Sequence, residues 1–322
     1  MAETTAPEAS YRPIPVGVLQ EGTVTPTDLY ARTGPGTYVL YRASTTPLRT
    51  QVLQRLDERG ISTLYVEAEH EEAYQRYIEE NIKEIISSGE VSRKKASKII
   101  YATSRRVMKD VFDSPRSGEN IERVERTVEA SVTNILKDPD ALWDMTSLVG
   151  HDYYTYSHCV NVSLFLVAGC KEMLDITDTR VLQEVGLGGM LHDIGKSVIP
   201  DSILNKPGKL TDEEFDVIRG HPTQGAELVR ENRDLPERAE SIILQHHERC
   251  DGSGYPAGLS GDKLDEVCRL ASIVDVYDAI TTKRSYAAAM APVKALKVML
   301  QEMSGHFDEA ILRSFVAFLG GA

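Results

Sequence analysis

The sequence predicts a mainly α-helical protein, with a small N-terminal α+β domain (residues 1–75), a helical connector (76–126) and an all-α C-terminal domain (127–322). Three observations support this prediction. Short runs of β-branched and aromatic residues occur near the N-terminus, a long charged segment with helical periodicity follows, and apolar helical patterns separated by Gly- and Pro-rich loops occupy the remainder. A chain of 322 residues is long enough to form two hydrophobic cores.

Two segments near the N-terminus have the composition of β-strands. Residues 37–41 (TYVLY) and 61–66 (ISTLYV) are rich in aromatic and β-branched side chains. Between them we expect a helix with Thr46 as its N-cap, Pro47 in its first turn and Gly60 as its stop signal. These elements predict a small α+β domain. Because no residue in it carries chemistry, we expect it to have a regulatory or oligomerising role.

The segment from Glu71 to Lys137 is highly charged and helical in its apolar spacing, and its sole proline is Pro115. Such a segment is typical of packed helices rather than of a flexible tether. It could transmit a signal or form the contact of a homodimer. A solvated helix pair packed on the neighbouring domain is an equally good interpretation, because charged helix faces usually face solvent.

Helical signals continue beyond Pro139. One apolar segment closes at residues 188–192, and Thr211 with Glu214 forms a capping-box signature that opens another helix. Two further helices are expected over residues 240–247 and 268–281. This half of the chain is therefore predicted to be nearly all α.

Charge and hydropathy exclude several classes of protein. A net charge of −13 argues against binding to duplex nucleic acid, which needs many Lys and Arg contacts to phosphate. No apolar run reaches the roughly 18 residues needed to span a bilayer, so membrane insertion is not expected. The four cysteines lack CxxC spacing and the start of the chain lacks the features of a signal peptide, which predicts reduced thiols in the cytoplasm.

A set of histidines and aspartates in the C-terminal half predicts a metal site. Imidazole and carboxylate groups are suitable ligands for iron, manganese and zinc. The aspartates lie in apolar stretches, where burial would be costly unless a cation compensated their charge. A buried network of His–Asp pairs is the alternative. The set consists of His158, His192, Asp193, His221, His246, His247 and Asp275.

The spacing within this set suggests a two-metal hydrolase. Because His192 and Asp193 are adjacent, the histidine can bind one ion while the carboxylate bridges two ions about 3.5–4 Å apart, which share a hydroxide that attacks phosphorus. Lys196 follows within one turn, where its ammonium group can neutralise charge that develops on the phosphoryl group. A surface salt bridge is the alternative role for this lysine.

Four motifs resemble those of the HD-GYP family. They are HDIGK (192–196), HPTQG (221–225), HHERCDGSGYP (246–256) and DVYDAITTKRSY (275–286), and they occur in the order found in the family. The resemblance covers roughly residues 127–322. An HD pair by itself would indicate a broad superfamily of metal-dependent phosphohydrolases, whereas the GYP loop with its flanking HHE narrows the assignment.

The resemblance implies an HD-type helical bundle that carries two or three iron or manganese ions. It also implies hydrolysis of cyclic di-GMP to pGpG and often onward to GMP. Zinc accepts the same ligands and is a further option. Lys196 and Asp193 take the catalytic roles, and the implied metal ligands are His158, His192, Asp193, His221, His246, His247 and Asp275.

The resemblance also suggests contacts with substrate and with a partner. The expected substrate-binding residues are Arg284, Lys283, Tyr255 and Asp278. The loop from Gly254 to Pro256 would border the pocket or contact a GGDEF-domain protein. Glycine and proline in this loop also predict a simple turn, which is compatible with either role.

Two departures from the family pattern refine these expectations. Members with three metals have a glutamate one turn before the first histidine, whereas this chain has Tyr154, so we expect two metals. A binuclear site can stop at pGpG, and onward hydrolysis to GMP is the alternative. The family commonly has Lys or Arg after the tyrosine of this segment, whereas Ala287 follows Tyr286 here, and Ser285 stands in place of a proline. Both departures predict weaker or altered contacts with substrate. The alternatives are a cyclic di-GMP receptor or GGDEF-docking module with little turnover, and a phosphodiesterase for another cyclic dinucleotide such as cyclic GMP-AMP.

Overall fold

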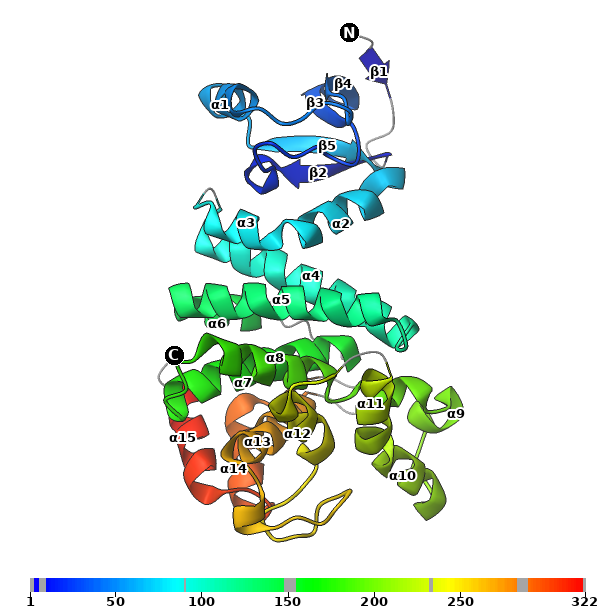
Figure 1. The fold of residues 1–322 in the computed structure, drawn as a ribbon, viewed down its shortest axis with the longest axis vertical. Coiled ribbons are helices and arrows are strands. Elements are labelled where there is room, and N and C mark those ends of the chain that lie inside the picture. The colour runs from blue at the N-terminus through cyan, green and yellow to red at the C-terminus, as the bar shows by residue number, and fades with distance from the viewer. Residues whose placement is uncertain are drawn as a thin grey trace. The chain divides into compact units, whose positions relative to one another are not determined.

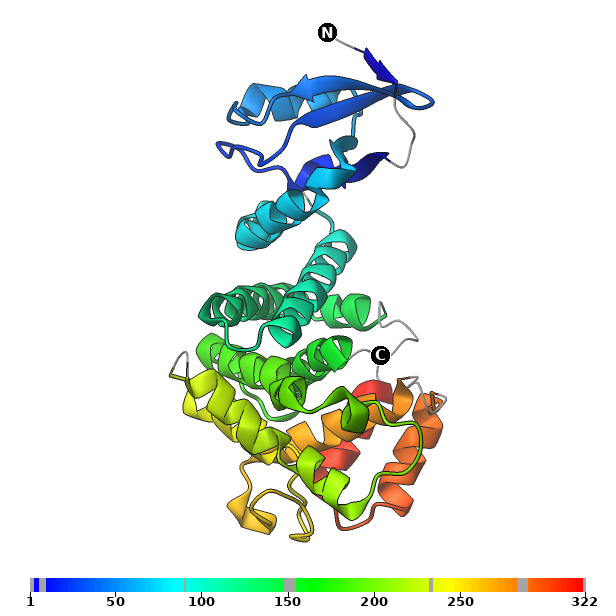
Figure 2. The same cartoon turned by 90° about the vertical axis from the view of Figure 1, so that its right-hand side faces the viewer.

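The computed structural model describes residues 3–5, 10–89, 91–147, 155–231, 234–282 and 289–320. The chain divides into two compact units, residues 1–96 and 97–322. This division falls inside the predicted connector, so the boundaries expected at residues 75 and 126 do not coincide with it. The structure is mainly α, with one sheet near the N-terminus, as the sequence predicts (Figures 1 and 2).

The N-terminal unit contains an antiparallel sheet in the order β1-β4-β3-β5-β2. The two predicted strands are β4 and β5, and β1, β2 and β3 were not predicted. Proline occurs twice in β2 (YRPIP), where it is tolerated because β2 is an edge strand and its prolines need not donate to a second neighbour. The strands are β1 (Glu3–Thr5), β2 (Tyr11–Pro15), β3 (Leu29–Gly34), β4 (Thr37–Arg42) and β5 (Thr63–Glu67).

The predicted helix between these strands begins later than expected. Helix α1 (Thr50–Glu58) has Arg49 as its N-cap, so the prediction that Thr46 caps it with Pro47 in its first turn is wrong. Leu48 is buried, and its backbone bonds to Thr23 O and Gly22 N, which holds this stretch out of the helix. Gly60, with a φ of 64°, follows the end of the helix as predicted.

The core of the N-terminal unit is built from aromatic and aliphatic side chains. The Tyr11 and Tyr38 rings stack with centroids 4.0 Å apart, and Tyr65 meets Tyr38 edge-on at 5.1 Å. Leu29 and Leu64 are fully buried. The remaining elements of this unit are η2 (Val16–Val18), η3 (Ala68–His70), α2 (Glu71–Glu80) and α3 (Ile82–Ser87).

The C-terminal unit is a helical bundle. Its helices are α4 (Arg93–Asp113), which begins just before the unit boundary, α5 (Gly118–Lys137), α6 (Asp140–Thr146), α7 (Thr155–Met173), α8 (Thr179–Leu191), η4 (Ile194–Val198), α9 (Asp201–Leu204), α10 (Asp212–Arg219), α11 (His221–Arg230), α12 (Glu237–Gln245), η5 (Gly261–Lys263), α13 (Glu266–Thr281), α14 (Pro292–Gln301) and α15 (Glu309–Gly320). The predicted capping box at Thr211 and Glu214 is confirmed. Pro115 lies in the turn between α4 and α5.

Helices α7 and α13 form the centre of this bundle and are buried over most of their length. Helix α8 packs on α7, and α5 packs in turn on α8 (Figure 1). Gly189 allows the α7–α8 approach, because a Cβ atom there would lie 2.7 Å from Ser163 Cα. This close packing brings the C-terminal end of α8 to the middle of the bundle.

Among the described residues, no helix is both long enough and apolar enough to cross a membrane. All four cysteines are free thiols, and Cys159, Cys170 and Cys268 are buried.

Candidate metal centre

The seven predicted metal ligands come together in the C-terminal unit. His158 lies on α7 and Asp275 on α13, whereas the other five lie at helix ends. His192 and Asp193 close α8, His221 opens α11, and His246 and His247 close α12. Residues separated by more than 100 positions in the sequence therefore meet at one point.

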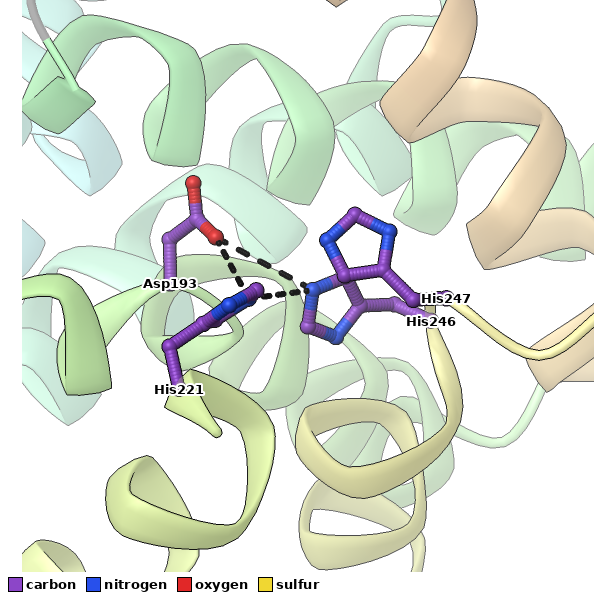
Figure 3. Close-up of side chains that lie close together, drawn as sticks. All are labelled: Asp193, His221, His246 and His247. Atoms are coloured by element: carbon purple, nitrogen blue, oxygen red, sulfur yellow. Dashed lines mark hydrogen bonds and ion pairs between the residues drawn. The ribbon is translucent and has the colours of Figure 1, made fainter. Parts of the chain in front are cut away.

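The side chains form two groups that share Asp193. The first group contains His158, His192 and Asp275, and the second contains His221, His246 and His247. Asp193 Oδ2 lies 3.5 Å from His192 Nε2 and 3.8 Å from His158 Nε2. Asp193 Oδ1 lies 3.2 Å from His221 Nε2 and 3.9 Å from His246 Nε2 (Figure 3). One carboxylate thus turns one oxygen toward each group.

Backbone contacts set the orientation of three of the histidines. The Nδ1 atoms of His192, His221 and His246 donate to the carbonyl oxygens of Gly189, Ile218 and Ile243, at 2.8, 2.7 and 2.9 Å. A neutral imidazole that donates from Nδ1 presents a lone pair at Nε2. The carbonyls therefore direct the Nε2 lone pairs into the centre of the site.

These lone pairs face one another at short distances. His221 Nε2 and His246 Nε2 are 3.1 Å apart, and His158 Nε2 and His192 Nε2 are 3.3 Å apart. Two acceptor nitrogens cannot hydrogen-bond to each other, whereas a cation between them would satisfy both. The arrangement fits one cation in each group.

The ionisation states also suit a divalent cation. Burial lowers the pKa of His192, lowers that of His246 well below its ordinary range and lowers that of His247 to about 3. Burial raises the pKa of Asp193, but the Lys196 ammonium and His192 lower it more, so the net pKa is well below its usual range. Neutral imidazole and ionised carboxylate together form the donor set of Mn, Fe and Zn sites.

A hydrogen-bonded His–Asp network does not account for the whole cluster. His158 does contact Asp275, with 3.0 Å between Nε2 and Oδ1. However, Asp193 Oδ1 is buried and has no hydrogen-bond donor, which is costly for a carboxylate oxygen. A bound divalent cation would supply the missing partner.

Lys196 is adjacent to the shared carboxylate. Its Nζ donates to Asp193 Oδ2 at 2.6 Å, and its side chain is 17% exposed, so it lies between the buried centre and solvent. Gly195 makes this placement feasible, because a Cβ atom there would lie 2.0 Å from His221 O. Helix η4 therefore packs directly on α11 and brings Lys196 to the site. The alternative of a surface salt bridge does not match this position.

The GYP loop borders the second group. The Tyr255 ring lies 4.7 Å from the His247 ring, and the Arg219 guanidinium is 5.8 Å from the Tyr255 ring. The buried Glu248 carboxylate accepts hydrogen bonds from Ala257 N at 2.7 Å and Leu259 N at 2.9 Å, which fixes the path of the loop. Position 254 must be glycine, because a Cβ atom there would lie 2.4 Å from the backbone nitrogen of Arg249. The loop is thus both a turn and a wall of the site.

The predicted substrate contact at Asp278 requires correction. Its side chain is buried behind His158, with Oδ2 accepting from His158 Nδ1 at 2.7 Å. Its Oδ1 accepts from Asn161 Nδ2 at 3.0 Å. Both oxygens are occupied, so Asp278 is placed to orient His158, one of the predicted metal ligands, and does not face open space.

Of the other predicted substrate-binding residues, the structure describes only Tyr255. Tyr255 reaches the site, whereas Lys283, Arg284 and the departure at Ala287 lie outside the described residues. Tyr154, on which the expectation of two metals was based, also lies outside them.

Three residues near the site were not predicted from the sequence. Asn161 supports Asp278, Glu248 fixes the GYP loop, and Arg219 lies over Tyr255. Glu248 directly follows the paired histidines and Arg219 precedes His221 by two positions, so proximity to the motifs was the available signal. Their roles depend on the paths of the loops, which local patterns do not specify.

Comparison with known proteins agrees with this geometry. The family described as HD domain matches residues 156–311. The chain is 38% identical over 224 residues to "Cyclic di-GMP phosphodiesterase PA4108" of Pseudomonas aeruginosa, a match that covers 69% of this chain and 53% of that protein. It is 40% identical over 123 residues to "3'3'-cGAMP-specific phosphodiesterase 2" of Vibrio cholerae, covering 38% of this chain and 24% of that one. The chain therefore spans about half the length of the first of these relatives and less of the second.

A solved structure has a similar fold. Bd1817, described as an HDG"Y"P protein from Bdellovibrio bacteriovorus, superimposes with a TM-score of 0.67 at 23% identity. The match covers 97% of this chain and 100% of that chain.

Proposed function

Because the chain belongs to the HD-GYP family, we propose that it is a metal-dependent phosphodiesterase that hydrolyses cyclic di-GMP. One observation carries this proposal. Asp193 directs its two oxygens to two separate groups of imidazole and carboxylate ligands, and Lys196 lies against the same carboxylate. This is the arrangement expected of a two-metal hydrolase.

Two divalent ions fit the two groups, with iron or manganese expected and zinc as the alternative. His158, His192 and Asp275 would hold one ion, and His221, His246 and His247 the other, with Asp193 common to both. When bound, such ions polarise phosphoryl oxygens and activate water for attack on phosphorus. With Tyr154 in place of the glutamate of three-metal members, the product is pGpG.

The residues around the ligands have separate tasks. Lys196 presents an ammonium group beside Asp193, where it neutralises the charge that develops on the phosphoryl oxygens. Tyr255 offers a ring face next to His247, and Arg219, which is exposed, is placed to pair with a substrate phosphate. Asp278 holds His158 with its Nε2 lone pair directed toward the centre.

The GYP loop is also suited to contact a GGDEF-domain partner. Residues 256–258 are exposed, whereas Glu248 holds the base of the loop. A rigid base with an exposed tip suits a docking element, because little ordering is needed on binding.

The test is turnover of cyclic di-GMP by anaerobically purified protein loaded with Fe(II) or Mn(II), with metal counted on the same sample. Formation of pGpG with about two metals per chain is the expected result. Tight binding of cyclic di-GMP without turnover would replace the proposal with a receptor function.

Cyclic GMP-AMP is the second candidate substrate, because one of the relatives is named as specific for it. A parallel assay on 3',3'-cyclic GMP-AMP separates the two candidates. A higher kcat/KM on that substrate would overturn the assignment of cyclic di-GMP.

A further inference from the structure

A buried chain of hydrogen bonds leads from α4 to the metal ligand His158. Tyr101 Oη donates to Asn161 Oδ1 at 2.9 Å, and Asn161 Nδ2 donates to Asp278 Oδ1 at 3.0 Å. Asp278 Oδ2 then accepts from His158 Nδ1 at 2.7 Å. All four residues are at most 3% exposed. We propose that Tyr101 and Asn161 are positioning residues that set the orientation of His158 and hence the affinity of the metal centre.

The direction of each hydrogen bond in this chain is fixed. A neutral His158 that donates from Nδ1 to Asp278 presents its lone pair at Nε2, which lies 3.0 Å from Asp275 Oδ1, and a cation bound between these two atoms would serve both. Asn161 must turn its amide nitrogen to Asp278, which leaves its carbonyl oxygen to accept from Tyr101. Burial raises the pKa of Tyr101 to about 12, which keeps the hydroxyl protonated as a donor. Removing any member would leave a buried polar group without a partner.

A second contact holds α7 on the other side of His158. Arg105 Nε donates to Ser157 Oγ at 2.9 Å. Tyr101 and Arg105 are one turn apart on α4, and their partners Asn161 and Ser157 are one turn apart on α7 in the reverse order. Helix α4 therefore contacts α7 on both sides of His158, as antiparallel neighbours can.

Helix α4 includes residues of both units of the chain. Helix α4 begins at Arg93, within the N-terminal unit, and continues without a break to Asp113 in the C-terminal unit. A shift or rotation of α4 would lengthen the Tyr101–Asn161 hydrogen bond and release Asp278 and His158 from their fixed orientations. The inference rests on the proposed metal centre and adds a route by which α4 modulates it.

The test is titration of the metal-free full-length chain with Mn(II), read by electron paramagnetic resonance. Tyr101→Phe removes one hydroxyl and keeps the ring, and Tyr77→Phe is the matched control. Tyr77 is buried to a similar degree, and its hydroxyl bonds to Gln20 N at 2.9 Å and lies 2.7 Å from Thr23 Oγ1, in the other unit. We expect Tyr101→Phe to weaken Mn(II) binding about 10-fold, as outer-shell partners of metal ligands do, and Tyr77→Phe to leave it unchanged.

A double-mutant cycle tests whether the residues act in series. Asn161→Ala should weaken Mn(II) binding by up to about 100-fold, and adding Tyr101→Phe to it should change little. Wild-type affinity in Tyr101→Phe, or equal losses in Tyr101→Phe and Tyr77→Phe, would overturn the proposal. Additive losses in the cycle would also overturn it, because they would show independent effects.

The Mn(II) titration contains no substrate, so it tests this inference, which rests on the proposed metal centre, separately from the hydrolysis of cyclic di-GMP. A wild-type chain that binds Mn(II) but does not hydrolyse cyclic di-GMP contradicts the function alone. Failure of the wild-type chain to bind Mn(II) would overturn this inference, whereas turnover of cyclic di-GMP by the Fe(II)-loaded chain would still support the function.

Discussion

The two units of the chain bury different kinds of side chain. The N-terminal unit fills its core with stacked tyrosines and with leucines such as Leu29 and Leu64, and Glu79 is the one buried acid in its described part. The C-terminal unit buries a cluster of ionisable groups, which are His158, His192, Asp193, His221, His246, Glu248, Asp275 and Asp278. Burial of such groups is unfavourable unless a partner compensates their charge. The contrast therefore locates the chemistry in the C-terminal unit.

The contrast also implies that the two units respond differently to perturbation. A core built mainly of apolar and tyrosine side chains responds little to metal and mild acid, because Glu79 is the one buried acid in its described part. A core of imidazoles and carboxylates is sensitive to both, since its stability depends on charge compensation.

Asp193→Ala should have the largest effect. It removes the carboxylate shared by both ligand groups, so we expect metal content to fall and metal-dependent turnover of cyclic di-GMP to decrease by more than about 10³-fold. Unfolding of the N-terminal unit should not change. Asp201→Ala, at an exposed position on α9, is the control. Near-native turnover in Asp193→Ala would rule out the shared-ligand role.

Lys196→Ala should affect rate but not metal content. We expect kcat to fall by about 10²–10³, the range for loss of one group that stabilises transition-state charge. Metal analysis should still find the same number of ions per chain as in the wild type. The exposed Lys209→Ala provides a charge-matched control. Loss of metal together with rate would show that Lys196 acts mainly by stabilising Asp193.

Removal of metal should destabilise the C-terminal unit selectively. Binding to the folded state alone stabilises it by about 2.7 kcal/mol per site when free metal is 100 times Kd. Calorimetry with and without chelator should therefore shift one transition and leave the other in place. Leu64→Ala, which opens a cavity in the N-terminal core and costs about 2–5 kcal/mol, identifies the transition of that unit. Equal shifts of both transitions on chelation would contradict the comparison.

Acid should produce the smallest of these effects, in the metal-free protein. Burial lowers the pKa of His247 to about 3 and that of His246 well below its ordinary value of 6.5. Between these values the unfolded chain binds protons that the folded chain does not, so stability of the C-terminal unit should decrease as the pH falls from about 6.5 toward 3.

The N-terminal unit should respond at the opposite end of the pH scale. Burial raises the pKa of Tyr11, and raises that of Tyr30 to about 12. Their contribution to stability is present below pH 10 and lost as the pH rises above it.

Thermal melts followed by circular dichroism at pH 7, 5.5 and 4.5 test the predicted acid sensitivity of the C-terminal unit. A parallel decline of both transitions would show that the buried histidines are not responsible.

Prediction from the sequence succeeded where a local pattern carries the information. The strands at residues 37–41 and 61–66, the helical periodicity of residues 71–137 and the capping box at Thr211 all appear in the structure, because each depends on neighbouring residues. The start of α1 was mispredicted for the opposite reason. Hydrogen bonds from Leu48 to a loop more than 20 residues earlier override the capping signal at Thr46.

For the metal centre, residue types and their order are enough to indicate the chemistry, as His192, Asp193 and Lys196 illustrate. The packing of the helices sets which oxygen of Asp193 faces which group, and it places Asp278 behind His158. It also creates the hydrogen bonds that join Tyr101 to Asp278 through Asn161. Residue type sets what a group can bind, whereas hydrogen-bond partners and distances depend on the packing of α4, α7, α8 and α13, which lie far apart in the sequence.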